Sequence, residues 1–266
     1  MTTVREDDYI HFYGLTEAPF ALTPDPHFLF PTEANQKALQ GIYSCVRRGE
    51  GYAVLTGDIG TGKTLICRAL LELFERDKIE TALLVNPFIS EEELVRALLN
   101  DFGVSLSDVA PGEETSGSRA EVQRMMDAFT DFLTERSENG VRCVAIVDES
   151  QNLPISALEQ LRIMGNLETN KEKLLQIVLV GQNEFLDALK HSRLMQLVQR
   201  ISNWYRLGPM PRSIVGDYFR GSCKTPIGVV LHRAFDGPTI RAVKLLVTPP
   251  PFFLQEKHGT TSSATR

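Results

Sequence analysis

Residues 52–74 read Tyr52-Ala-Val-Leu-Thr-Gly57-Asp-Ile-Gly60-Thr-Gly62-Lys63-Thr64-Leu-Ile-Cys-Arg-Ala-Leu-Leu-Glu-Leu-Phe74 and decide the fold of the chain. A short apolar run comes first, the pattern Gly-x-x-x-x-Gly-Lys-Thr follows, and apolar residues then recur at helical spacing. This order predicts a buried strand, a phosphate-binding loop and a helix. The alternative is a glycine-rich turn that contains a lysine by chance, but it does not explain the strand before the turn and the helix after it.

The residue types of this loop suit a nucleoside triphosphate. Glycines let backbone N–H groups turn inward around a phosphate, and the unpaired amides that open the following helix add to them. Lys63 is a point charge for the β and γ phosphates of ATP. The Thr64 hydroxyl is small enough to stay on a Mg²⁺ ion that keeps most of its waters. The predicted nucleotide-binding residues are Gly57, Asp58, Ile59, Gly60, Thr61, Gly62, Lys63, Thr64 and Leu65.

A second chemical signal lies about 85 residues after the loop, in Cys143-Val-Ala-Ile-Val-Asp148-Glu149. Five apolar residues in a row predict a strand covered on both faces, as in a parallel sheet between helices. Its two carboxylates then stand at the sheet edge where α/β proteins bind ligands. Asp148 suits a partner of Mg²⁺, and Glu149 suits the base that orients an attacking water. Taken alone this motif is weak, and a structural role is its alternative.

Further buried strands are predicted over residues 81–86 and 174–180, and a fifth strand over residues 203–207 closes the sheet. Helices are predicted from Thr32 to Arg47, from the capping box at residues 90–93 through Phe102, and over residues 119–137 and 157–167. The strand at 174–180 ends in Gly-Gln-Asn, where we expect Gln182 to hold the water or the γ-phosphate. The alternative for Gln182 is an exposed turn residue.

The composition is that of a soluble globular protein, with 42% hydrophobic and 23% charged residues among 266. The polar start and the lack of a run of about 18 apolar residues predict no signal peptide, no membrane span and a cytoplasmic location. The four cysteines show no metal or disulfide spacing. From Lys190 onward the sequence has twelve Lys or Arg and three Asp or Glu, which gives this part a net charge of +9. The whole chain has a net charge of −6, so the first 189 residues have a net charge of −15. This asymmetry is either an ordinary solvated surface or a sign of an anionic partner or of contacts between subunits.

The chain divides into four parts on these patterns. Residues 1–31 combine prolines with many aromatics, which predicts an extended segment packed on the core. Its stretch 20–28 either walls the adenine pocket or packs in the core. Residues 32–210 form the predicted nucleotide-binding core, and residues 211–250 a small remnant with frequent prolines. Residues 251–266 are predicted to be disordered.

Several separated motifs together resemble the AAA+ ATPases of the ExeA, or general secretion pathway protein A, type. They are the phosphate loop, Val147-Asp-Glu-Ser-Gln-Asn-Leu153, Leu179-Val-Gly-Gln182 and Gln196-Leu-Val-Gln-Arg-Ile201, together with Phe12-Tyr-Gly-Leu, Pro19-Phe20, Thr23-Pro-Asp-Pro26 and Asn86-Pro-Phe-Ile-Ser90. The likeness covers about residues 10–210. It implies an α/β fold, a P-loop NTPase of the AAA+ (ASCE) class with a five-stranded parallel sheet in the order 5-1-4-3-2, flanked by helices and followed by a helical lid.

The resemblance also implies that ATP sites lie between the subunits of a ring. By matching position, Arg200 is then the arginine that reaches a neighbour's γ-phosphate, and Arg193 is a weaker choice; surface salt bridges are the alternative for both. Two departures from the family stand out. Met195 replaces an expected arginine, and no Gly-Ile-Pro-Arg-like stretch with a γ-phosphate-sensing arginine follows Pro211, which predicts a truncated or atypical lid.

The function expected first is Mg²⁺-dependent hydrolysis of ATP by an oligomeric AAA+ ATPase that remodels or loads a protein partner in secretion, pilus or exopolysaccharide machinery. In this reading Lys63, Glu149, Gln182 and Arg200 act in hydrolysis, and Thr64 and Asp148 hold the metal. One alternative is a DNA-associated regulator of the transposition type, which the basic end of the chain favours and the acidic body does not. Another is a nucleotide-gated switch with little turnover.

Overall fold

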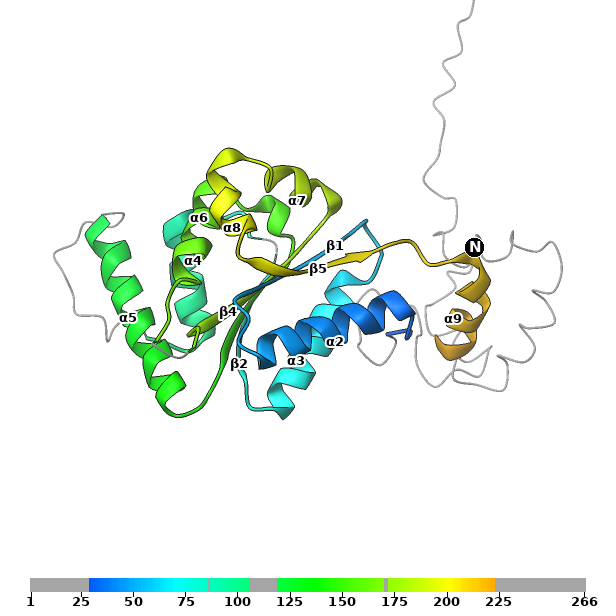
Figure 1. The fold of residues 1–266 in the computed structure, drawn as a ribbon, viewed down its shortest axis with the longest axis horizontal. Helices are drawn as coiled ribbons and strands as arrows, with labels where there is room; N and C mark the ends of the chain where they lie inside the picture. Colours follow the sequence, from blue (N-terminus) through cyan, green and yellow to red (C-terminus); the bar gives the residue numbers. More distant parts are fainter. Residues whose placement is uncertain (1–28, 86, 106–118, 170–171, 223–266) are drawn as a thin grey trace, which may run out of the picture. The chain divides into compact units, whose positions relative to one another are not determined.

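The computed structural model describes residues 29–85, 87–105, 119–169 and 172–222 (Figure 1). The chain divides into two compact units: Phe20–Pro211 forms one, and Met1–Pro19 with Arg212–Arg266 forms the other. The expected aromatic wall at residues 20–28, the loop at 106–118 and most of the C-terminal remnant lie outside the described residues.

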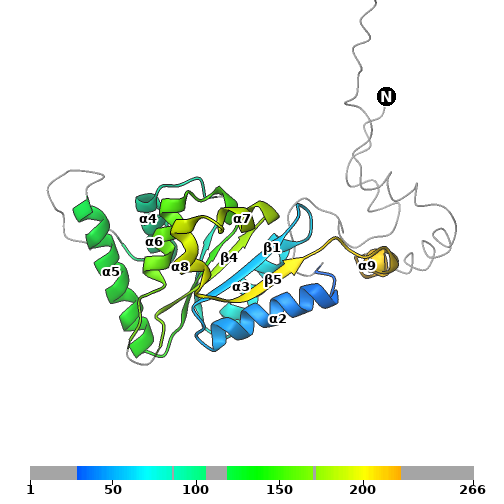
Figure 2. The same cartoon turned by 45° about the horizontal axis from the view of Figure 1, so that its top comes forward.

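The first unit is built on one parallel sheet of five strands (Figures 1 and 2). Its order is β2-β3-β4-β1-β5, which confirms the order implied by the family resemblance. Every neighbouring pair is parallel. The strands are β1 (Tyr52–Gly57), β2 (Glu80–Leu84), β3 (Cys143–Val147), β4 (Leu175–Gly181) and β5 (Ile201–Leu207).

Helices cover both faces of this sheet, which explains the uninterrupted apolar runs (Figure 2). Every residue of β3 and β4 is buried, Gln176 among them. One face packs under α2 (Glu33–Arg47) and α3 (Lys63–Arg76). The other packs under α4 (Glu91–Asp101), α5 (Arg119–Glu138), α6 (Ile155–Met164), α7 (Asn183–Ala188) and α8 (Met195–Val198). Two short 3₁₀ turns lie in the connections: η2 (Ser150–Asn152) between β3 and α6, and η3 (Ser192–Leu194) between α7 and α8.

Two helix starts follow directly from their sequences. The Thr32 hydroxyl accepts a hydrogen bond from the amide of Asn35 at the start of α2. At α4 both bonds of the capping box form between Ser90 and Glu93. Because each bond satisfies an amide that has no partner inside the helix, both starts were readable from sequence.

Some predicted boundaries and elements differ from the structure. Helix α6 ends at Met164, three residues before the predicted end, because Asn166 and Leu167 continue in a turn. The strand over residues 203–207 begins earlier, at Ile201. In the second unit, a 3₁₀ turn η4 (Arg212–Ile214) and helix α9 (Val215–Ser222) form at the start of the predicted remnant at residues 211–250. Among the described residues, no helix is long and apolar enough to cross a membrane.

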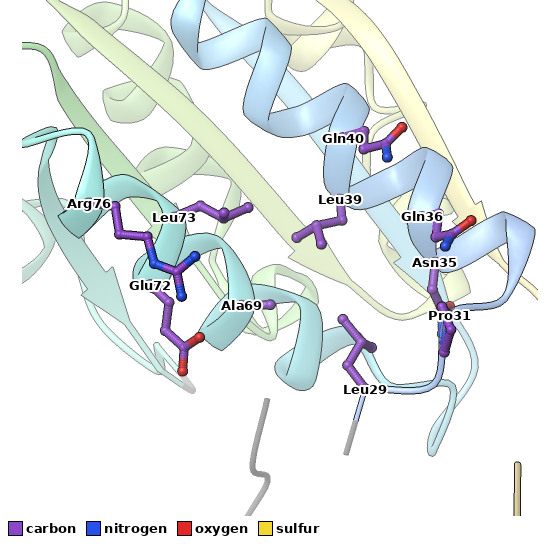
Figure 3. Close-up of a pocket in the computed structure, with 10 residues that line it drawn as sticks. All are labelled: Leu29, Pro31, Asn35, Gln36, Leu39, Gln40, Ala69, Glu72, Leu73 and Arg76. Atoms are coloured by element: carbon purple, nitrogen blue, oxygen red, sulfur yellow. The ribbon is translucent and has the colours of Figure 1, made fainter. Parts of the chain in front are cut away.

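A cavity of about 370 Å³ lies between α2 and α3 (Figure 3). Its walls are largely apolar, with Leu29, Leu39 and Leu73 among them, and it contains none of the predicted site residues.

Candidate active site

The phosphate loop connects β1 to α3 in a shape that requires glycine. Gly60 and Gly62 have φ of 77° and 90°, a region that is strained for residues with a Cβ. Gly62 is also the residue immediately before α3, with no side-chain cap, so the first amides of this 14-residue helix remain available to a ligand. The loop therefore has the backbone shape that a phosphate-binding site needs, and phosphate binding at these residues stays a prediction.

Neighbouring elements hold the loop in place. A Cβ on Gly57 would lie only 2.7 Å from the carbonyl oxygen of Leu207 on β5, so the loop begins in close contact with that strand. The Thr61 hydroxyl donates to the Asp58 carbonyl at 2.8 Å. The side-chain amide of Asn183, at the start of α7, donates a hydrogen bond to the Asp58 carboxylate. These contacts fix the loop from β5 and from α7.

Lys63 is buried within this loop, with 6% of its surface exposed. Its Nζ donates to the carbonyl oxygens of Gly57 at 2.9 Å and Asp58 at 3.0 Å. The ammonium therefore lies inside the curl of the loop, where it faces the position expected for the β and γ phosphates.

Thr64 and Asp148, the two residues predicted to hold Mg²⁺, lie within hydrogen-bonding distance of each other. The Thr64 hydroxyl donates to Asp148 Oδ2 at 2.9 Å, and the Glu149 amide donates to Oδ1 at 2.9 Å. Asp148 is only 2% exposed, and its own amide donates to the Leu84 carbonyl at 2.8 Å. Burial raises the pKa of this carboxyl above its ordinary value, against the opposing effect of the two hydrogen bonds.

This pair suits Mg²⁺ bound together with a nucleotide. Mg²⁺ prefers hard oxygen ligands and takes one or two from the protein, with waters and phosphate oxygens completing the shell. A hydroxyl and a carboxylate oxygen supply such ligands here. No group of three or more His, Cys, Asp or Glu side chains gathers around one point in the described ranges, so nothing there resembles an all-protein metal cage.

Glu149 lies beside this pair in the left-handed conformation, with φ 54° and ψ 40°. Its Oε2 accepts a hydrogen bond from Gln182 Nε2 at 3.1 Å and another from the side-chain amide of Gln151. The structure thus brings Gln182 and Glu149 together, as expected for two groups around one water. Gln151 and Asn183 were not predicted. The available signal for Gln151 was its position two residues after Glu149, and for Asn183 its position at the tip of β4.

Arg200 lies far from this cluster within the same chain. It directly precedes β5, whose first residue pairs with Tyr52 at the beginning of β1, whereas the phosphate loop follows the end of β1. The six residues of β1 separate the two points by roughly 20 Å. Arg200 is exposed, and its backbone amide donates to the Leu197 carbonyl at 3.0 Å. Its guanidinium makes no ion pair or hydrogen bond within the described part of the chain. Arg193, in contrast, lies 3.5 Å from Glu159 in an exposed ion pair, as the salt-bridge alternative had it.

A family model described as an AAA domain matches residues 46–189 of the chain. General secretion pathway protein A of Aeromonas hydrophila is 36% identical, over 86% of this chain and 42% of that protein. This chain therefore spans less than half the length of that relative.

Solved structures show the same fold at low identity. The ORC1 protein of Aeropyrum pernix, solved in complex with DNA, is 18% identical with a TM-score of 0.54, over 79% of this chain and 58% of its own. Cdc6p of Pyrobaculum aerophilum is 21% identical with a TM-score of 0.50, over 77% and 54%. Because the matched model covers more than half of the sequence, the chain belongs to the AAA domain family, and its five-stranded parallel sheet has the AAA+ fold.

Proposed function

We propose that this chain binds ATP with Mg²⁺ and hydrolyses it to ADP and phosphate. The observation that carries the proposal is the position of Glu149 directly beside the Thr64–Asp148 pair, within hydrogen-bonding distance of Gln182. A carboxylate that reaches past a metal-binding pair toward a polar amide is the arrangement that an attacking water needs.

Each residue of the site has a distinct task in this proposal. The loop amides and Lys63 bind the phosphates and stabilise the charge that develops on them. Thr64 and Asp148 hold Mg²⁺, which when bound neutralises charge between the β and γ phosphates. Glu149 orients a water in line with the γ-phosphate and accepts its proton, and Gln182 donates to that water or to a γ-phosphate oxygen.

The role of Arg200 requires a second subunit. Arg200 lies at the amino-terminal end of the strands, whereas the phosphate loop of the same chain lies at their carboxyl-terminal end. It can therefore contact a γ-phosphate only in a neighbouring copy of the chain. We therefore include a homo-oligomer, formed as a ring in the presence of nucleotide, in the proposal. The name of the relative from Aeromonas hydrophila suggests that the energy of hydrolysis remodels or loads a protein of secretion machinery. A cytoplasmic location stays a prediction from the sequence.

The test compares wild type with Glu149→Gln, which keeps the size of the side chain and removes the base. Turnover of ATP should fall by about 10²–10⁴-fold while ATP affinity is retained. Glu75→Gln makes the same chemical change on the exposed side of α3 and should turn over ATP like wild type. Equally low turnover in wild type and Glu149→Gln would overturn the hydrolase proposal and leave a nucleotide-gated switch.

Light scattering of the same samples tests the oligomer. Mass should increase with ATP, and a monomer under every nucleotide condition would remove the role given to Arg200. Salt-dependent binding to duplex DNA would favour the DNA-associated alternative. Half of the twelve Lys and Arg residues on which that alternative depends lie at residues 223–266, outside the described part.

A further inference from the structure

Gln151 lies between Glu149 and Gln182, two residues of the candidate hydrolysis site. It lies in η2, the single 3₁₀ turn that follows Glu149, and its side chain meets the tip of β4. Its Oε1 accepts a hydrogen bond from the backbone amide of Gln182 at 3.0 Å, and its Nε2 donates to Glu149 Oε2. One side chain therefore joins the tip of β4 to the carboxylate at the tip of β3.

The chemistry of the partners fixes the orientation of this amide. The backbone N–H of Gln182 can only donate, so it must face the oxygen of Gln151. The NH₂ group is then left to face Glu149, whose ionised carboxylate can only accept. A glutamine satisfies both partners at once. A leucine of similar size would satisfy neither, and a glutamate would place a second negative charge beside Glu149.

The backbone around Gln151 is shaped to allow this bridge. Glu149 adopts its left-handed conformation, and the amide of Asn152 donates to the Glu149 carbonyl at 2.9 Å, which closes the turn. The Ser150 hydroxyl, fully buried, donates to the Val147 carbonyl at 2.8 Å and ties the turn to β3. On the other side, a Cβ on Gly181 would lie 3.0 Å from Gln151 Oε1. A side chain at position 181 would therefore press against the amide oxygen, and glycine leaves it room.

We propose that Gln151 is a positioning residue for hydrolysis, which holds the Glu149 carboxylate and the Gln182 backbone in one fixed relation. The inference rests on the proposed function, because it assigns Glu149 to the attacking water. Gln151 acts through Glu149 and Gln182 and touches neither the phosphates nor the metal. Its loss therefore changes the turnover number more than the binding of ATP.

The experiment measures kcat, KM and ATP affinity for Gln151→Leu, Gln151→Asn and Gln151→Glu. The turnover number should fall by about 10- to 100-fold in all three, with KM and Kd changed by less than about threefold. Asn retains the amide but is one methylene too short to reach both partners. Gln123→Leu, the same exchange on the exposed side of α5, should leave kcat unchanged. If Gln151 served packing alone, Gln151→Leu would keep its activity, and that result would overturn the inference.

A double variant separates this inference from the proposed function. In a Glu149→Gln background, Gln151→Leu should cause little further loss, since the base that it positions is already absent. Independent, additive losses would refute a role through Glu149. If wild type and Glu149→Gln turn over ATP equally slowly, the hydrolase proposal fails and this inference fails with it. If wild type is active, Glu149→Gln is not, and Gln151→Leu matches wild type, only the inference fails.

Discussion

Replacement of Thr64 by valine tests, in two separable ways, the proposal that Thr64 and Asp148 bind the metal. Valine has nearly the same shape as threonine but lacks the hydroxyl that donates to Asp148 Oδ2 at 2.9 Å. Asp148 is almost fully buried and would keep only the donor from the Glu149 amide. A hydrogen bond to a charged group contributes about 1.5–3 kcal/mol, and we expect the free energy of unfolding without nucleotide to fall by that amount. For a unit of this size the loss corresponds to a decrease in Tm of about 3–12 °C.

The second effect appears with nucleotide. Saturation with MgATP at about 100 times Kd should stabilise the wild type by about 2.7 kcal/mol. In Thr64→Val the part of that stabilisation that depends on Mg²⁺ should disappear, because one of its two protein oxygens is gone. Thr64→Ser retains the hydroxyl and should keep both effects. The assay is thermal unfolding with no nucleotide, with ATP and EDTA, and with MgATP.

Two outcomes would refute this reasoning. A Thr64→Val variant as stable as wild type without nucleotide would show that the hydroxyl contributes nothing to holding the buried carboxylate. An unchanged response to Mg²⁺ would show that the Thr64–Asp148 pair does not bind the metal.

The remaining predictions concern a buried carboxylate and a crowded glycine. Burial raises the native pKa of Asp148 above the ordinary value of 3.8, so the native state binds the proton more tightly, and stability is lost as pH rises through that native pKa. Asp148→Asn should therefore gain stability relative to wild type as pH rises through this window while losing ATP turnover, and a difference in unfolding free energy that does not change with pH would contradict it. Gly165→Ala should lose about 1–3 kcal/mol in denaturant unfolding, because the new Cβ would lie 2.0 Å from the hydroxyl of Tyr52, which is buried and bonded to the Leu161 carbonyl at 3.0 Å. Gly51→Ala, with no heavy atom within 4 Å, is the control and should stay within about 0.5 kcal/mol of wild type; equal stability of the two variants would be the contrary result.

The sequence predicted the centre of the sheet because strands β1, β3 and β4 are buried on both faces. The apolar runs at β3 and β4 leave no other environment for so many consecutive side chains, and the capping residues Thr32 and Ser90 mark helix starts through local hydrogen bonds. The order of the strands came from the family resemblance, since local patterns carry no information on which strands are neighbours. Short elements such as α7 and α8 were not predicted, because a helix of four to six residues shows too little periodicity.

Some residues of the candidate site could be predicted from the sequence, and others could not. The phosphate loop and Asp148-Glu149 are recognisable because each follows a strand directly, and strand ends can be read from burial patterns. Gln151 was not found, because its contact with Gln182 joins residues 31 positions apart and depends on the left-handed turn at Glu149. Its position two residues after Glu149 was the available signal, but that position alone does not predict a contact with the tip of β4.

The strand order explains how separate signals become one site. β3, β4 and β1 are neighbours in the sheet, and their registers pair Val147 with Leu179 and Gly181 with Thr56. β4 and β1 therefore end within one residue of each other, and β3 ends two residues earlier, just before Asp148 and Glu149. Neighbouring strands are about 4.8 Å apart, so the three strands span roughly 10 Å across the sheet. Three of the four side chains proposed for hydrolysis come from these tips. Arg200 enters from the opposite end of β5, so the same parallel order that assembles most of the site in one chain places its last member where only another chain can use it.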